Sequence, residues 1–262
     1  MKLKNIIDII ETIAPKHLKE DFDNVGLMVG DKDKEVSRIL VALDCTTSVI
    51  EEGKSLGVEL ILTHHPLLFR KPATITTDTL LGRKIIELIK NDINLYAAHT
   101  NWDSVKEGLN DTLVSMLGFE ESQIISKNKN GEDAGIGRII QLKEEKSLNE
   151  IIEKVKYSLN VKNLRYVGEL DKNIKTIAII NGSGQDFFES SRRLGADLVI
   201  TGDTTYHFVS DYEEMGLGII DIGHFNSEWP VLVKLSEVLK MNLGDGVKIY
   251  ISKVSKDPYT FI

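Results

Sequence analysis

An internal repeat is the feature that most constrains what this chain can fold into. The segment Ile39–Thr63 (ILVALDCTTSVIEEGKSLGVELILT) has a counterpart in Ile177–Thr201 (IAIINGSGQDFFESSRRLGADLVIT). Both segments are typical of a strand, a turn, a helix, a Leu-Gly pair and a second strand ending in Thr. The Leu-Gly pairs, Leu56-Gly57 and Leu194-Gly195, are 138 positions apart, as are the two final threonines.

A second pair of motifs follows in the same order. His99-Thr-Asn-Trp-Asp103 matches His224-Phe-Asn-Ser-Glu228 at an offset of 125 positions, and each motif follows a predicted strand and precedes a predicted helix. Any two strand-helix-strand units share some patterning, which is the simpler explanation of the first match. A His, an Asn and an acid in register favour a true duplication related by a pseudo-twofold axis.

The alternation of strands and helices predicts an α/β fold class, with two related α/β half-domains around mixed sheets. Polar, Gly-containing Lys127–Gly135 is the candidate linker. The predicted halves are therefore residues 1–126 and 136–262, and the C-terminal strand could pack back on the first half. The predicted strands are Ile39–Leu43, Val58–Leu62, Ile93–Ala98, Ile139–Leu142, Ile177–Ile180, Leu198–Ile200, Ile219–Ile222 and Val247–Ile251, with helices including Leu80–Ile89 and Leu109–Leu117.

Composition argues against several kinds of protein. The 32 basic and 40 acidic residues give a net charge of −8, which disfavours nucleic acid and anionic membrane surfaces as main partners. A single cysteine, Cys45, excludes an internal disulfide and a cysteine-rich zinc site. No apolar run approaches the roughly 18 residues that a membrane span needs, so we expect a cytoplasmic protein.

His64 and His65 are the first candidate metal ligands. They follow the predicted strand Val58–Leu62, and functional groups in an open α/β sheet gather at the carboxyl ends of its strands. Adjacent residues of an extended segment point to opposite sides, so both histidines serve one centre only if they bind different ions or the chain turns. Two ordinary strand-end histidines, one buried and one solvated, are the simpler alternative.

The repeat adds Asp103, His224 and Glu228 to the candidate set. The two acids occupy equivalent positions, and a pseudo-twofold axis would bring them and His224 toward His64 and His65. Imidazole and carboxylate ligands without thiolates suit zinc, manganese or ferrous iron. Five protein ligands exceed the three that one catalytic ion usually takes, and they fit two divalent ions about 3.5–4 Å apart. Glu228, with its longer side chain, is the candidate bridging ligand.

Neighbouring polar residues have weaker signals. We interpret His99 as orienting a ligand, facing the substrate or moving a proton, although a purely structural histidine is an equal alternative. Asp203 is interpreted first as a helix N-cap and second as lining the site. Asp44 ends a strand and is a weaker candidate, and Asn24 is explained by turn chemistry. Gly182-Ser183-Gly184 lacks the spacing of a phosphate-binding loop.

Taken together, these motifs resemble those of the NGG-interacting-factor-like family, whose bacterial members carry the label GTP cyclohydrolase 1 type 2 homologue. The resemblance rests on Asp23-Asn-Val-Gly-Leu27, Thr63-His-His-Pro66, His99-Thr-Asn-Trp-Asp103, Thr201-Gly-Asp203 and Gly223-His-Phe-Asn-Ser-Glu228. It implies a cytoplasmic, ring-shaped homohexamer with a dinuclear metal site in each subunit. The family's ligand positions fall on the five residues named above.

Two functions follow as hypotheses. The first is a metal-dependent hydrolase acting on a small-molecule substrate such as a nucleotide or cyclic amide, because two ions can activate water and stabilise developing charge. The second is a non-catalytic protein that binds or buffers metal, or an assembly held together by the ions.

Overall fold

The computed structural model describes residues 1–262, and the chain divides into two compact units. Unit 1 comprises Met1–Trp102 and Leu232–Lys256, and unit 2 comprises Asp103–Val231 and Asp257–Ile262. The division falls inside two helices, α4 (Thr100–Ser104) and α9 (His224–Leu243). These boundaries differ from the expected halves 1–126 and 136–262.

Unit 1 is built on a five-stranded mixed sheet in the order β1-β4-β3-β2-β11. Strands β2, β3 and β4 are parallel, β11 extends the sheet in parallel beside β2, and β1 is antiparallel to β4. The bounds are β1 (Gly26–Val29), β2 (Arg38–Ala42), β3 (Leu60–Thr63), β4 (Asn94–Ala97) and β11 (Lys248–Ile251). All four residues of β3 and of β4 are buried, which explains their continuous apolar sequences.

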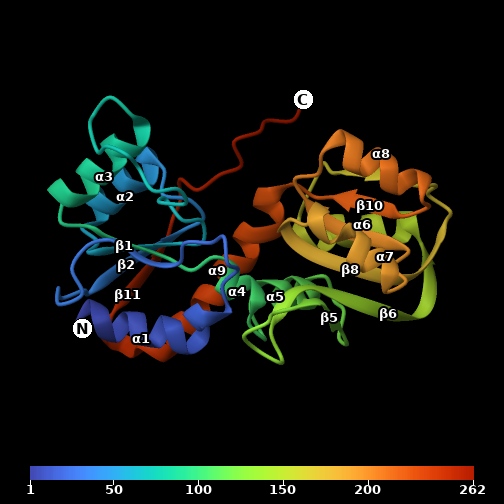
Figure 1. The fold of residues 1–262 in the computed structure, drawn as a ribbon, viewed down its shortest axis with the longest axis horizontal. Coiled ribbons are helices and arrows are strands. Elements are labelled where there is room, and N and C mark those ends of the chain that lie inside the picture. The colour runs from blue at the N-terminus through green and yellow to red at the C-terminus, as the bar shows by residue number, and fades with distance from the viewer. The chain divides into compact units, whose positions relative to one another are not determined.

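Helices cover both faces of this sheet (Figure 1). Helices α2 (Thr47–Leu56) and α3 (Leu80–Lys90) pack on one face through a core that includes Ile50, Ile61 and Leu88. Helix α1 (Leu3–Ile13) lies on the other face with the C-terminal part of α9. The buried residues of α1 are spaced three and four apart, as the burial of one helical face requires.

Unit 2 contains a six-stranded mixed sheet in the order β5-β6-β8-β9-β10-β7. Strands β8, β9 and β10 are parallel, whereas β6 and β7 run antiparallel to their neighbours. The bounds are β5 (Gln123–Lys127), β6 (Gly135–Ser147), β7 (Arg165–Val167), β8 (Asn173–Ser183), β9 (Leu198–Gly202) and β10 (Gly218–Asp221).

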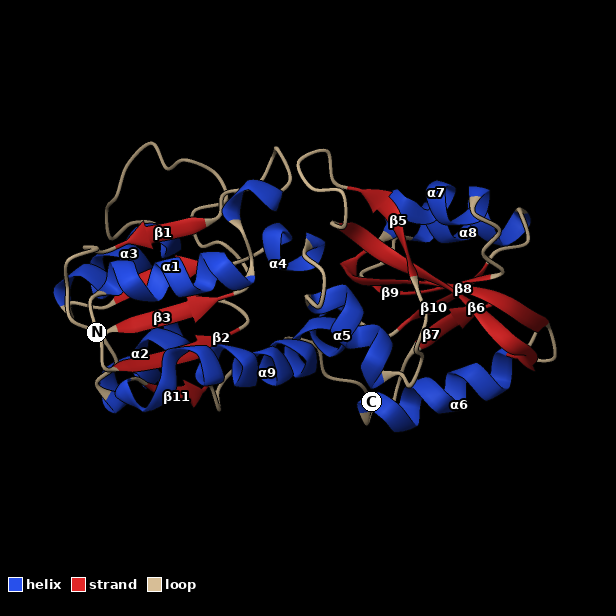
Figure 2. Ribbon diagram, turned by 90° about the horizontal axis from the view of Figure 1, so that it is seen from below, coloured by secondary structure: helices blue, strands red, loops and turns tan.

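Helices also lie on both faces of the second sheet (Figure 2). Helices α7 (Phe188–Arg193) and α8 (Tyr206–Glu214) lie on one face, and α5 (Leu109–Met116) and α6 (Leu148–Leu159) lie on the other. Helix α6 begins with a capping box, in which Ser147 and Glu150 satisfy each other's backbone N–H groups. Three short 3₁₀ helices complete the chain, η1 (Lys16–Leu18), η2 (Gln185–Phe187) and η3 (Gly244–Gly246).

The element order supports the duplication expected from the sequence. Unit 1 runs α1-β1-β2-α2-β3-α3-β4, and unit 2 runs α6-β7-β8-α7-β9-α8-β10. Their sheets share the order β1-β4-β3-β2 and β7-β10-β9-β8, each with an antiparallel edge strand. The expected α/β class with mixed sheets is confirmed.

The expected linker Lys127–Gly135 has a different role. Lys127 and Gly135 are paired residues of the antiparallel strands β5 and β6, so the polar segment between them closes a hairpin inside unit 2. Turns and linkers share the same polar, Gly-containing composition, which explains the wrong assignment. No helix of the structure is long and apolar enough to cross a bilayer.

Candidate metal centre

The five predicted ligands fall into two groups, one in each unit. His64 and His65 belong to unit 1, and Asp103, His224 and Glu228 belong to unit 2. In both units the side chains lie where the parallel strands end or where the next helix begins. This is the edge of an α/β sheet at which functional groups ordinarily collect.

In unit 1, the chain bends directly after β3 and brings both adjacent histidines into one cluster. The fully buried His64 lies with its Nδ1 2.9 Å from the carbonyl oxygen of Ala98, which follows the neighbouring strand β4. The Nδ1 of His65 lies 2.9 Å from Oδ1 of Asp44, which follows β2. The Thr63 hydroxyl donates to the His65 carbonyl at 2.8 Å and holds the bend.

His99 completes this cluster from the end of β4. Its Nδ1 lies 2.9 Å from Oδ1 of Asp23, whose other oxygen accepts bonds from the backbone N–H and the hydroxyl of Thr100. Burial raises the pKa of the Asp23 carboxyl, but His99 and Thr100 together outweigh that effect and lower the pKa to about 2. Asp23 is therefore an ionised acceptor at neutral pH.

The three rings are close enough to share a cation. Ring centroids are separated by 5.1 Å for His64–His65, 5.0 Å for His64–His99 and 5.5 Å for His65–His99. One ring nitrogen from each histidine lies within 4.8 Å of the other two. Ligands of one zinc ion at about 2.1 Å can be at most about 4.2 Å apart, so small ring movements suffice for joint binding.

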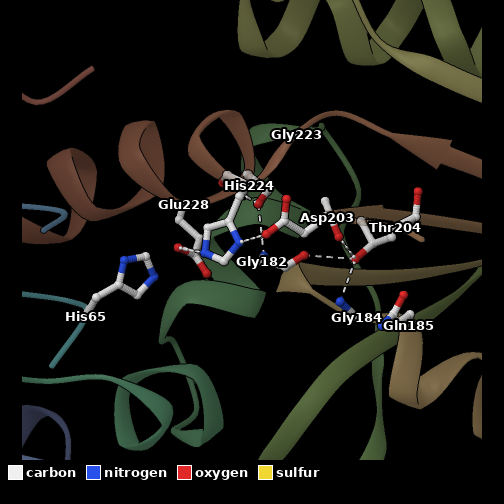
Figure 3. Close-up of polar contacts among 12 residues, drawn as sticks. His65, Gly182, Gly184, Gln185, Asp203, Thr204, Gly223, His224 and Glu228 are labelled. Carbon is white, nitrogen blue, oxygen red and sulfur yellow. Dashed lines mark hydrogen bonds and ion pairs between the residues drawn. The ribbon is translucent and has the colours of Figure 1, made fainter. Parts of the chain in front are cut away.

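In unit 2, His224 is held between two carboxylates (Figure 3). Its Nδ1 lies 2.9 Å from Oδ2 of Asp203, and its Nε2 lies 2.9 Å from Oε2 of Glu228. His224 is the first residue of α9, and Glu228 is one helical turn later on the same face. A neutral imidazole has one N–H group and cannot donate to both carboxylates, so this arrangement is satisfied either by a doubly protonated ring or by a cation at Nε2.

The end of β8 positions both carboxylates of the predicted set. Asn181 donates through Nδ2 to Oδ1 of Asp103 at 2.8 Å. The next residue, Gly182, has φ of +60°, and a Cβ on it would lie 2.2 Å from Oε1 of Glu228. Glu228 and Asp103 are 3% and 7% exposed, and carboxylates are buried to this extent only when paired or bound to a cation.

A common arrangement links the four histidines of the two groups. In His64, His65, His99 and His224, Nδ1 lies 2.9 Å from a carbonyl or carboxylate oxygen, and such an oxygen can only accept a hydrogen bond. In each neutral ring the proton is therefore on Nδ1 and the lone pair on Nε2. Metal-binding histidines are ordinarily oriented in this way. The donor set fits a divalent ion such as zinc, iron or manganese.

Three acids that orient histidines had only weak sequence signals. Asp203 was expected to cap a helix, but Thr205 precedes α8, and Asp203 bonds to His224 instead. Its φ of +54° marks a special backbone position that sequence alone did not reveal. Asp23 and Asp44 bond to His99 and His65 across 76 and 21 residues of sequence, so only the folded chain identifies these pairs.

The Gly182-Ser183-Gly184 segment also has a structural explanation. The Gly182 N–H donates to the Ser227 hydroxyl at 2.9 Å, and the Gly184 N–H donates to the Thr201 hydroxyl at 3.0 Å. Its glycines allow close approach of Glu228 and Thr201. Nothing in this arrangement resembles a phosphate-binding loop.

Comparison with known proteins decides the family. A family model described as Duf34/NIF3 (NGG1p interacting factor 3) matches residues 1–258. The chain belongs to the DUF34/NIF3 family. A relative from Clostridium perfringens named GTP cyclohydrolase 1 type 2 homolog is 67% identical over 262 residues, covering 100% of both chains. A relative of the same name from Clostridium acetobutylicum is 52% identical over 265 residues, covering 100% of this chain and 99% of its own.

Solved structures of other proteins share the fold. A Bacillus cereus protein related to NIF3 has a TM-score of 0.91 at 27% identity, covering 100% of this chain and 99% of its own. Reduced HcgD from Methanocaldococcus jannaschii has a TM-score of 0.83 at 37% identity, covering 96% of this chain and 97% of its own.

Proposed function

We propose that this DUF34/NIF3 protein binds two divalent metal ions and uses them to hydrolyse a small-molecule substrate. The ligands are His64, His65, Asp103, His224 and Glu228, and the metal is zinc, iron or manganese. The observation that carries the proposal is the shared orientation of the histidines, each with Nδ1 beside an oxygen that can only accept a hydrogen bond.

The number and kind of ligands favour two ions over one. One catalytic ion usually takes about three protein ligands, and five with two carboxylates among them suit a pair of ions. Glu228, whose Oε2 lies 2.9 Å from Nε2 of His224, would hold an ion together with that ring. Because close relatives carry the name GTP cyclohydrolase 1 type 2 homolog, the first substrates to consider are nucleotides and cyclic amides.

The residues around the ions have separate tasks. When bound, two such ions lower the pKa of a coordinated water and stabilise negative charge that develops on the substrate. Asp23 keeps the proton of His99 on Nδ1, so the lone pair of His99 is on Nε2, where it would either join His64 and His65 as a ligand or accept a proton from water. Asp44 and Asp203 fix the rings of His65 and His224.

Turnover by metal-loaded protein tests the hydrolase. Purine nucleotides, phosphoesters and cyclic amides would be incubated with the parent, with Glu228→Ala and with the control Glu237→Ala, an exposed acid on the same helix. We expect turnover of at least one substrate by the parent and Glu237→Ala, and none by Glu228→Ala. Stoichiometric metal without any turnover would instead support the non-catalytic metal-binding alternative.

We also propose that the protein forms a ring-shaped homohexamer in the cytoplasm, with itself as its main partner. Light scattering coupled to size-exclusion chromatography measures this directly. About six times the chain mass of 29.3 kDa is expected, and a monomer would contradict the assembly.

A further inference from the structure

A cavity of about 350 Å³ lies in unit 2, between helix α8 and the edge strand β7. Small-molecule sites usually begin at about this volume. The metal ligands proposed above do not line it. The residues that do are Arg165, Tyr166, Val167, Thr204, Thr205, Tyr206, Val209, Ser210, Glu213, Ile219 and Asp221.

The sequence pattern of the two elements explains how the walls form. On α8, Tyr206, Val209, Ser210 and Glu213 recur at helical spacing and share one face. On the sheet, β7 and β10 pair Val167 with Ile219 and Arg165 with Asp221. Alternate residues of a strand share a face, so these two pairs lie side by side on the sheet.

The chemistry of the cavity changes along its length. The Arg165 side chain is 70% exposed and Tyr206 is 80% exposed, and both line the cavity together with Thr204, which follows β9. Val167, Val209 and Ile219 form an apolar middle. Glu213, seven residues after Tyr206 on α8, adds a carboxylate to the cavity lining.

Buried Asp221 holds the Arg165 side chain in place. Its Oδ2 accepts hydrogen bonds from Arg165 and from the Thr204 hydroxyl, the latter at 2.6 Å. Both hydrogen bonds of the Arg165 side chain use Nη2, so the N–H groups of Nε and Nη1 can serve a ligand. The other oxygen of Asp221 accepts from the N–H of Gly223, the residue before His224.

We propose that this cavity binds the organic part of the substrate, a planar heteroaromatic ring that carries an anionic group such as a phosphate. The anion pairs with Arg165, the ring lies on the Tyr206 side chain and the apolar middle, and Glu213 accepts from ring N–H groups. The inference rests on the proposed function, because it assigns the cavity to that substrate. The cavity and the proposed metal ligands are linked along the chain, because Thr204 in the cavity wall directly follows Asp203, which bonds to His224.

Binding to metal-free full-length protein tests this site separately from the metal centre. Guanosine 5′-monophosphate, adenosine 5′-monophosphate, flavin mononucleotide and guanosine would be titrated by calorimetry in the presence of a chelator. We expect at least one nucleotide to bind with Kd below about 1 mM, and guanosine to bind more weakly. Failure of the metal centre would appear in metal analysis and would leave these titrations unchanged.

Two variants assign the binding to the cavity. Tyr206→Ala should weaken nucleotide binding by at least about fivefold, since stacking of a base on an aromatic ring is worth about 1–3 kcal/mol. Tyr157→Ala, at a tyrosine 91% exposed on α6 and outside the cavity, should have no effect. Arg165→Ala should weaken binding of the nucleotide and leave guanosine unchanged, whereas Arg193→Ala should change neither.

Two results would overturn the inference. One is the absence of binding by all three nucleotides up to about 1 mM. The other is binding that Tyr206→Ala and Arg165→Ala leave unchanged while both variants retain the parent's thermal unfolding temperature.

Discussion

The carboxylate of Asp203 holds the ring of His224, with Oδ2 2.9 Å from Nδ1. Such an acceptor fixes the tautomer and direction of a metal-binding histidine, and its loss typically lowers metal affinity 10–100-fold. Asp203→Ala should lower affinity by roughly this factor, and Asp203→Asn by less, since its amide oxygen can still accept. Competition with a chelator measures metal affinity, which should fall in the order parent, Asp203→Asn, Asp203→Ala. Asp211→Ala, an exposed acid on α8, is the control, and equal losses in all three variants would contradict the assignment.

A Cβ at position 182 should displace the proposed bridging carboxylate. Gly182→Ala places a methyl group 2.2 Å from Oε1 of Glu228, at a φ of +60°. We expect loss of metal and destabilisation from both overpacking, about 1–3 kcal/mol, and the left-handed backbone, about 1–2 kcal/mol. Gly195→Ala shares the positive φ of +84° but meets nothing within 4 Å. It should show only the backbone cost in denaturant unfolding and retain its metal; metal loss in both variants would refute the contact.

Asp23 should make unit 1 sensitive to acid. Its pKa falls from 3.8 to about 2 in the folded protein, so ionised Asp23 stabilises the fold above about pH 4. This lowering of the pKa corresponds to about 2 kcal/mol of folding stability, and that contribution disappears as the pH falls through about 2. Asp23→Asn should be less stable than the parent by this amount near pH 6 and equal to it near pH 2, in urea unfolding of the metal-free protein. An equal difference at both pH values would show that the charge of Asp23 is unimportant.

The thiol of Cys45 should be unreactive in the native protein. Burial raises its pKa to about 12, and the residue is 3% exposed within the core of unit 1. Ellman's reagent near pH 8 should therefore react only when unit 1 opens, at a rate that rises with denaturant. Stoichiometric labelling within seconds of mixing in native buffer would be inconsistent with this packing.

Local sequence patterns predicted much of the fold. The predicted strand Ile39–Leu43 overlaps β2 with a shift of one residue, Ile177–Ile180 lies within β8, and Leu80–Ile89 lies within α3. These elements are short, apolar and bounded by turn residues, so their signals are local. The three-residue edge strand β7 was missed, because its residues Arg165 and Tyr166 are exposed and show no apolar pattern.

The candidate site was predicted as residue types and not as contacts. The repeat identified Asp103 and Glu228 through their positions relative to histidines. It could not identify Asp23 as the partner of His99, or Asn181 as the partner of Asp103, because these contacts span 76 and 78 residues. Long-range partners of this kind are determined by the pairing of strands and helices and leave no periodic signal in the chain.

Metal content is the most direct test of the central claim. Protein purified without a metal-affinity tag would be analysed by mass spectrometry for zinc, iron and manganese, beside Glu228→Ala and Glu237→Ala. About two equivalents per chain in the parent and in Glu237→Ala, with a sharp fall in Glu228→Ala, is the predicted result. No stoichiometric metal in the parent, even after reconstitution with each of the three ions, would contradict the dinuclear centre.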